Sequence, residues 1–309
     1  MKKDLKVIAS NLKDMIEDAI EIDQAGRYRE LLAKWIVQMN DAYAPAKQKT
    51  FRSHCGASLI GSDCDRQIWL GYYWTKQPRF SAQILRLFNH GHLQEAHFCV
   101  MLELLGAEIM QQNEEGKQYN FSHSNSHAGG SLDGIVKNLP YFEDELLTCE
   151  FKTYNDRYFK ELVKKGMVVC KPQHHAQILV GLEKFGLNYC IYMAINKNSS
   201  EIYVEIVEAQ KYVAGHYLER FDRIVFSDKP PEKVADSPVA KECQWCDFVE
   251  LCHRYDATGI DVNCRTCLHS YPSKDAELAG QWVCNKYNKP IPKDFALNGC
   301  NKWEQRVLW

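Results

Sequence analysis

The chain has 309 residues, of which 45% are hydrophobic and 25% charged, as in a soluble globular protein of one large domain or two modest ones. Its formal net charge of −2 excludes a polycation that coats nucleic acid, so a local basic patch would have to hold any acidic partner. The charged N-terminus lacks a secretory hydrophobic region, and no apolar run approaches the ~20 residues of a membrane span, which together predict an intracellular, cytoplasmic protein.

The hydrophobic pattern changes between helical and strand periods along the chain. Amphipathic helices come first, then short strands, a helical crossover and a hairpin. An aromatic-rich helix is also expected in the stretch FRSHCGASLIGSDCDRQIWLGYYW. The other expected helices cover 3–22, 26–43, 81–105, 156–166, 172–186 and 210–226, and the expected strands cover 107–113, 118–124, 129–138, 146–153, 188–196 and 201–208.

This order of elements predicts an α/β protein in which helices flank a mixed central β-sheet. A polar, proline-containing segment, SDKPPEKVADSPVAKE, precedes a cysteine-rich tail that lacks periodicity. We therefore expect an N-terminal helical arm over 1–45, a core over 46–255, and a metal-stapled, cysteine-rich module over 256–309.

The stretch LLTCEFKTYN, residues 146–155, places acidic and basic side chains on one face of an otherwise apolar strand. Glu150 and Lys152 are two residues apart, so they point the same way. Asp133, in GGSLDG, ends the preceding strand, and pairing of the two strands would bring it to Glu150. Two carboxylates at that distance suit Mg²⁺, and the ammonium beside them can hold or deprotonate a water or stabilise developing charge. The alternative is an exposed strand with solvated charges.

Other residues strengthen the interpretation as a metal site. Glycines bracket Asp133 and allow close approach of backbone or substrate. Glu95, in the preceding helix as GHLQE, could supply a third carboxylate. Gln173 and Gln177 lie one turn apart on a downstream helix, although the former is also a common kind of helix-start residue.

With these residues in this order, the chain resembles the PD-(D/E)xK nuclease superfamily, in its RecB-like and lambda-exonuclease-like branch. The resemblance covers about residues 55–255. Leu132 stands where the family name has proline, at a position that varies in the family. The matching positions are Gly91 and Glu95, Asp133 and Gly134, Glu150 and Lys152, and Pro172 and Gln177.

The resemblance implies a restriction-endonuclease-like nuclease core and metal-dependent hydrolysis of phosphodiester bonds in DNA. By carry-over, Mg²⁺ or Mn²⁺ is bound by Glu95, Asp133 and Glu150. Lys152 acts on the attacking water, and Gln177 orients Lys152 or contacts the substrate backbone.

The implied activity is an exonuclease on linear DNA ends in recombination or repair, in a bacterial or phage-infected cell. DNA and a recombination protein are the implied partners. A relative used in CRISPR adaptation is an alternative, and a site-specific restriction endonuclease a more distant one. From another class, the alternative is a catalytically silent, metal-stapled module that binds DNA or protein, against which the complete acid set argues.

A first cysteine set, ECQWCDFVELC, has the spacing C-x2-C-x5-C, which suits zinc or an iron–sulfur cluster. In the AddB and CRISPR-adaptation relatives, one further cysteine precedes the nuclease motifs and the four bind a [4Fe–4S] cluster. The resemblance therefore implies such a cluster here. The alternative is zinc, with His253 as the fourth ligand. The implied cluster ligands are Cys64, Cys243, Cys246 and Cys252.

A second set, with the spacing C-x2-C-x16-C-x15-C, lies in short, polar sequence with too little core to fold unaided. Four cysteines in such sequence predict a structural Zn²⁺ site, for which His269 is an alternative ligand. The predicted zinc ligands are Cys264, Cys267, Cys284 and Cys300.

The segment 155–171 carries five basic and two acidic residues. A charge run of this kind is usually a solvated face, but its place between the Glu-x-Lys strand and the glutamine helix also fits contact with phosphate.

Overall fold

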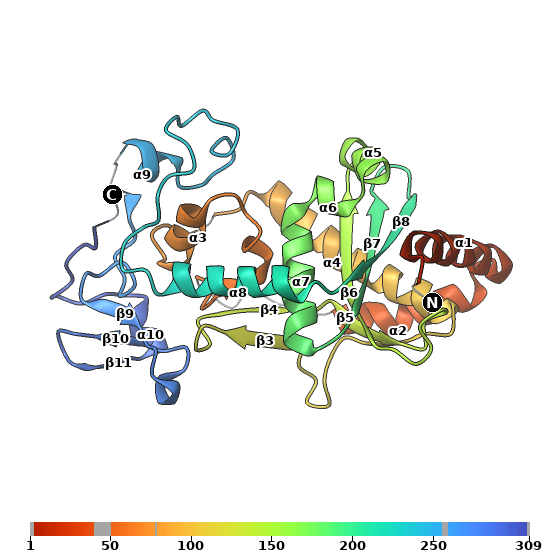
Figure 1. The fold of residues 1–309 in the computed structure, drawn as a ribbon, viewed down its shortest axis with the longest axis horizontal. Helices are drawn as coiled ribbons and strands as arrows, with labels where there is room; N and C mark the ends of the chain where they lie inside the picture. The colour runs from red at the N-terminus through yellow and green to blue at the C-terminus, as the bar shows by residue number, and fades with distance from the viewer. Residues whose placement is uncertain (1–2, 40–50, 78, 255–258, 308–309) are drawn as a thin grey trace. The chain divides into compact units, whose positions relative to one another are not determined.

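The computed structural model describes residues 3–39, 51–77, 79–254 and 259–307 (Figure 1). The contacts within the chain cluster into two compact units. Unit 1 comprises Met1–Gln48, Phe80–Phe121 and Ser131–Ala214, and unit 2 comprises Lys49–Arg79, Ser122–Gly130 and Gly215–Trp309. The predicted boundaries after residues 45 and 255 lie outside the described residues, so the division into arm, core and module stays a prediction.

A mixed five-stranded sheet forms the centre of unit 1, as the sequence predicts. Its order is β2-β5-β6-β7-β8, and only the neighbours β6 and β7 run parallel. That parallel pair requires a crossover, which three helices between the two strands provide. The strands are β2 (Glu108–Met110), β5 (Gly134–Lys137), β6 (Leu147–Tyr154), β7 (Tyr189–Asn196) and β8 (Ile202–Glu208).

Helices pack on both faces of this sheet. α1 packs on β8, α2 on α4, and α4 on β6, whereas α7 contacts β6 and β7. The expected helices are confirmed within about two residues, except that α2 ends at Gln38 and the expected end at 43 lies outside the described residues. α6 is an addition. The helices are α1 (Leu5–Asp23), α2 (Gly26–Gln38), α4 (Ala82–Leu104), α5 (Asp156–Lys165), α6 (Met167–Cys170) and α7 (Pro172–Phe185).

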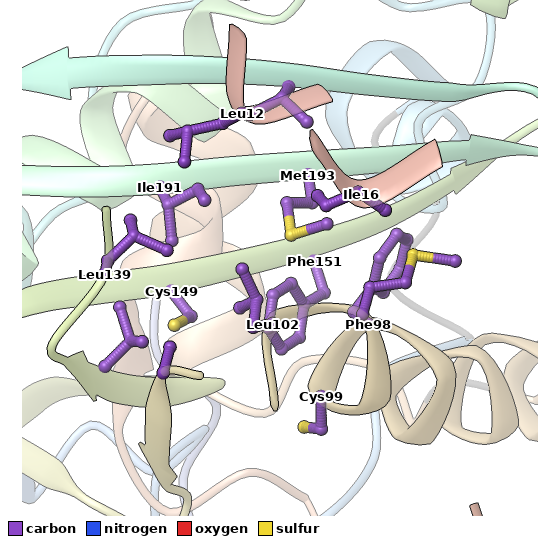
Figure 2. Close-up of a cluster of buried hydrophobic side chains, with 14 of the residues drawn as sticks. Leu12, Ile16, Phe98, Cys99, Leu102, Leu139, Cys149, Phe151, Ile191 and Met193 are labelled. Carbon is purple, nitrogen blue, oxygen red and sulfur yellow. The ribbon is translucent and has the colours of Figure 1, made fainter. Parts of the chain in front are cut away.

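The two faces of the sheet bury different side chains because alternate strand residues point in opposite directions. On one face, Cys149 and Phe151 of β6 pack with apolar residues of α1 and α4, as Figure 2 shows. On the other face, Tyr192 of β7 packs with apolar residues of α5 and α7. Glu150 and Lys152 belong to this second face, so α7 covers the charged side of β6.

Unit 2 contains the two cysteine sets and several short elements. The tail after residue 242, where no periodicity was found, forms a three-stranded antiparallel sheet, β11-β10-β9. Strands of three residues are too short to show a period. The elements are β1 (Cys55–Gly56), α3 (Asp65–Tyr72), β3 (Asn120–His123), β4 (Ala128–Ser131), α8 (Lys211–Val225), α9 (Val249–Arg254), β9 (Ser270–Pro272), β10 (Trp282–Cys284), β11 (Lys289–Ile291) and α10 (Lys293–Ala296), of which β3, β4 and α8 extend into unit 1.

A buried arginine ties the cysteine-rich tail to the aromatic helix within unit 2. The guanidinium of Arg265 lies 3.8 Å from the ring centroid of Trp74 and donates hydrogen bonds to the carbonyls of Tyr72 and Ser53. Stacking on aromatic rings lets a cation be buried at lower cost. In the described part of the chain, no helix combines the length and hydropathy that a bilayer-spanning segment requires.

Candidate active site

The predicted pairing of the two strands is confirmed, and it places Asp133 beside the middle of β6. β5 runs antiparallel to β6 with Gly134 opposite Cys149, and Asp133 directly precedes β5. The Oδ2 atom of Asp133 accepts a hydrogen bond of 2.7 Å from the backbone N–H of Phe151. This bond fixes the carboxylate at the level of the Glu-x-Lys pair.

Lys152 joins the two carboxylates. Its Nζ atom forms an ion pair with Oε1 of Glu150 and lies 4.0 Å from Oδ2 of Asp133. Glu150 is buried, and its Oε2 atom accepts a hydrogen bond of 3.1 Å from Nε2 of Gln177 on α7. Among the described residues, Oε1 of Glu150 accepts no hydrogen bond beyond its contact with the Lys152 ammonium. The structure thus brings four of the predicted site residues together.

Glu95 lies on α4 and acts on the same cluster through its charge. Its side chain is 25% exposed, and its Oε1 atom lies 3.4 Å from Nδ1 of His92. The negative charge of Glu95 contributes to the raised pKa of Asp133. Gln173, by contrast, is exposed near the start of α7, and none of the contacts described for the cluster involves it.

The cluster holds more negative than positive charge. Burial first, and then the charges of Glu150 and Glu95, raise the pKa of Asp133 to about 7, against the lowering effects of Lys152 and the Phe151 N–H. Burial lowers the pKa of Lys152, but the two neighbouring carboxylates outweigh it and raise that pKa above its ordinary value. An additional cation would relieve this imbalance.

A hydroxyl and imidazole cluster, which the sequence analysis missed, fixes α7 over this face. The hydroxyls of Tyr154 and Tyr192 are 2.7 Å apart, and Nδ1 of His174 lies 3.1 Å and 3.2 Å from them. Burial, with the charges of Lys152 and Lys171, lowers the pKa of His174 to about 3, so the ring is neutral. His174 lies one helical turn before Gln177, and this spacing is the signal in the sequence that could have identified it.

Close packing of α7 also sets the position of Leu132, the residue before Asp133. A Cβ atom added at Gly181 would lie 3.2 Å from Cδ2 of Leu132, tighter than an ordinary contact. Glycine at this position therefore lets the helix approach the chain just before the candidate metal ligand.

The raised pKa of Asp133 predicts a pH dependence of stability in metal-free protein. Its folded-state pKa of about 7 lies above the ordinary 3.8, so this group binds more protons in the folded than in the unfolded chain between these values. Its contribution to the free energy of unfolding is therefore full at low pH and is lost as the pH rises through about 7. Thermal unfolding in EDTA between about pH 4 and pH 8 measures it.

The control for this prediction is Asp133→Asn, which removes the titrating group and keeps an acceptor for the Phe151 N–H. Buried His127 and His174 have lowered pKa values and act in the opposite direction, so the quantity to compare is the difference between wild type and variant. The variant should become more stable than wild type as the pH rises. Parallel curves for the two proteins would contradict the assignment.

Each set of four cysteines lines a cavity of its own in unit 2. Cys64, Cys243, Cys246 and Cys252 line one cavity together with His253, whose Nε2 atom is 3.5 Å from Sγ of Cys243. Burial, with contributions from neighbouring thiols, raises the pKa of Cys246 to about 11.

The second cavity is lined by the predicted zinc ligands and by His269, which pairs with Glu304 at 2.9 Å. Burial and the other three thiols raise the pKa of Cys264 to about 11. Within residues 3–39, 51–77, 79–254 and 259–307, however, no group of three or more His, Cys, Asp or Glu side chains is arranged to hold a metal ion. The Mg²⁺, iron–sulfur and zinc centres therefore stay predictions. The lining cysteines of the second cavity are Cys264, Cys267, Cys284 and Cys300.

No family model matches the chain, and no curated protein matches it in sequence. Among solved structures, the chain is similar to LHK-Exo, an alkaline exonuclease from Laribacter hongkongensis, and to LHK-Exo in complex with dAMP, at 13% and 15% identity. Both matches have a TM-score of 0.40 and cover 56% of this chain and 86% of the other. The structure of SSO0001 matches at 15% identity with a TM-score of 0.39, covering 72% and 94%. Similarity at this level establishes neither family nor activity.

Proposed function

We propose that this chain is a metal-dependent nuclease that hydrolyses phosphodiester bonds in DNA. The observation that carries the proposal is the meeting of Asp133, just before β5, with Glu150 on β6. The ammonium of Lys152 contacts Glu150 and lies 4.0 Å from Asp133. Carboxylates and an ammonium in this arrangement suit a dication and a phosphate better than a purely structural ion pair, which would balance its charges.

Glu95, Asp133 and Glu150 would hold Mg²⁺ or Mn²⁺. The donors fit such an ion, because carboxylate oxygens are its preferred protein ligands. Among the described residues, buried Oε1 of Glu150 pairs with the Lys152 ammonium and accepts no other hydrogen bond. The raised pKa of Asp133 supports the same assignment. When bound, the ion would polarise the phosphate and lower the pKa of a coordinated water.

The remaining side chains position the reacting groups. Lys152, with its raised pKa, stays protonated in metal-free protein, so it is suited to donate hydrogen bonds to a water or to a phosphate oxygen. Gln177 restrains Oε2 of Glu150, so Oε1, which pairs with Lys152 in metal-free protein, would be the oxygen that binds the ion. The backbone N–H of Phe151 does the same for Asp133.

Among nucleases, we propose that this chain is an exonuclease acting on linear DNA ends, as the resemblance of the motifs implies. Purified protein is incubated with linear and with covalently closed circular duplex, in Mg²⁺ and in EDTA. Metal-dependent loss of the linear form alone is the expected result. Cleavage of the circle would indicate an endonuclease, and no cleavage of either would favour the silent binding module.

We also propose a structural [4Fe–4S] cluster and a structural Zn²⁺ site in unit 2. Convergence of each cysteine set on one cavity supports this, since thiolates with raised pKa values are stabilised by a metal ion. Protein purified without oxygen should contain iron and zinc in a ratio of about four to one. Cys246→Ala should remove the iron, and Cys264→Ser should remove the zinc. Each substitution should also lower the folding yield. Wild-type protein that contains no metal and still unfolds at a normal temperature would contradict the proposal.

A further inference from the structure

Tyrosines and cations form a line that leads away from the candidate active site within unit 1. Tyr154 lies two residues beyond Lys152 on the same face of β6, about 7 Å along the strand. The Nζ atom of Lys171 lies 5.5 Å from the ring centroid of Tyr154 and 4.8 Å from that of Tyr158. The guanidinium of Arg157 lies 5.8 Å from the Tyr158 ring. We call Tyr154, Lys171, Tyr158 and Arg157 the tyrosine–cation line.

Three of these residues lie where β6 ends and α5 begins, with a single residue between the two elements. β6 ends at Tyr154, and the next residue, Asn155, caps α5 by accepting a hydrogen bond of 3.0 Å from the Tyr158 N–H. Arg157 and Tyr158 therefore occupy the first turn of the helix. Lys171 stands at the junction of α6 and α7, where the chain returns to the same end of β6 (Figure 1).

The charge of this region is positive and only partly compensated. Two of its lysines are held by acidic residues one helical turn away: Lys160 by Asp156 at 2.8 Å and Lys165 by Glu161 at 2.6 Å. In the described part of the chain, the other basic side chains of the segment form no ion pair: Arg157, Lys164 and Lys171.

Tyr158 has the exposure that a stacking surface needs. Its side chain is 45% exposed. Tyr154, by contrast, is buried, and its hydroxyl is hydrogen-bonded to the hydroxyl of Tyr192. Aromatic side chains interleaved with cations are the usual means of binding single-stranded nucleic acid, because bases stack on the rings and phosphates meet the cations. A base inside a duplex is covered by its neighbours and offers no such face.

We propose that the tyrosine–cation line binds single-stranded DNA beside the bond that is cleaved. Lys171 and Arg157 contact its phosphates, and one base stacks on Tyr158. The inference rests on the proposed nuclease function, to which it adds the substrate class: the strand must be unpaired where it enters or leaves the site.

Binding of fluorescein-labelled DNA in EDTA, measured by anisotropy, tests the proposal without cleavage. The probes are a single strand of about 12 nucleotides and a blunt duplex of the same sequence. Tyr158→Ala is expected to weaken single-strand binding about 10-fold, and Tyr158→Phe to retain it. Lys171→Ala should weaken it and reduce the slope of log affinity against log salt by about 0.7. Lys160→Ala, on the same helix but paired with Asp156, is the matched control and should bind nearly as wild type does.

Thermal unfolding verifies that each variant is folded. The proposal would be overturned if Tyr158→Ala and Lys171→Ala bound the single strand as tightly as Lys160→Ala does. It would also be overturned if those two variants lost duplex binding and single-strand binding to the same extent. Wild type that binds the single strand as described yet cleaves no DNA in Mg²⁺ would contradict the nuclease function and leave the binding surface standing. Wild type that cleaves DNA, with variants that bind normally, would overturn the binding surface alone.

Discussion

Glu150→Gln is expected to abolish Mg²⁺-dependent DNA cleavage, with a loss of about 1,000-fold or more. The amide keeps the volume of the side chain and an acceptor for Gln177, but it removes a negative charge from the candidate metal site. Binding of Mn²⁺ without DNA, followed by electron paramagnetic resonance or calorimetry, should weaken in parallel. Because Glu150 raises the pKa of Asp133, that pKa should also fall in the variant.

Glu205→Gln is the matched control for this variant. Glu205 is a carboxylate of the same sheet, but it accepts hydrogen bonds from the Met167 N–H and the Tyr203 hydroxyl rather than facing the cluster. Its substitution should lower the melting temperature and spare cleavage and Mn²⁺ binding. Cleavage by Glu150→Gln within about 10-fold of wild type would contradict the site assignment.

Lys152→Met is expected to separate chemistry from metal binding. The variant keeps the apolar stem and loses the ammonium, so cleavage should fall by about 100-fold to 1,000-fold. Mn²⁺ affinity should be retained or increased, because the ammonium no longer pairs with Glu150 and no longer repels the ion. In EDTA the variant should be less stable at neutral pH, since two buried carboxylates lose their cation.

The comparison variant is Lys160→Met, which removes an exposed ammonium from α5 and should leave cleavage, metal affinity and stability almost unchanged. A Lys152→Met protein that cleaves DNA at the wild-type rate would show that the ammonium has no part in the reaction. Loss of Mn²⁺ binding in that variant would instead make Lys152 a structural residue that holds the carboxylates in place.

Local patterns were enough to predict the central part of the candidate site. Alternation in LLTCEFKTYN predicts β6 and puts Glu150 and Lys152 on one face, because strand geometry has a fixed period of two. The pairing of the two strands also followed, because β5 directly precedes β6 along the chain. The expected strand over 129–138 is divided into β4 and β5, however, so Asp133 stands just before β5 and not at the end of a strand.

Long-range pairing was the part that local patterns could not supply. Tyr192 reaches Tyr154 and His174 only because β7 lies parallel to β6 in a register that places Tyr192 opposite Glu150. The register depends on the whole crossover between the strands. Each of the two units is built from three separate segments of the chain, and α1 packs on β8. Both features likewise depend on which apolar surfaces meet and not on the pattern within any one segment.

The most direct test of the central claim is cleavage of a linear duplex in Mg²⁺ by wild type and by Asp133→Asn, prepared side by side and matched for folding by thermal unfolding. The account predicts that wild type releases nucleotides in Mg²⁺ and not in EDTA, and that Asp133→Asn releases none under either condition. Equal release by the two proteins would contradict the claim that Asp133, Glu150 and Lys152 form a metal-dependent nuclease site.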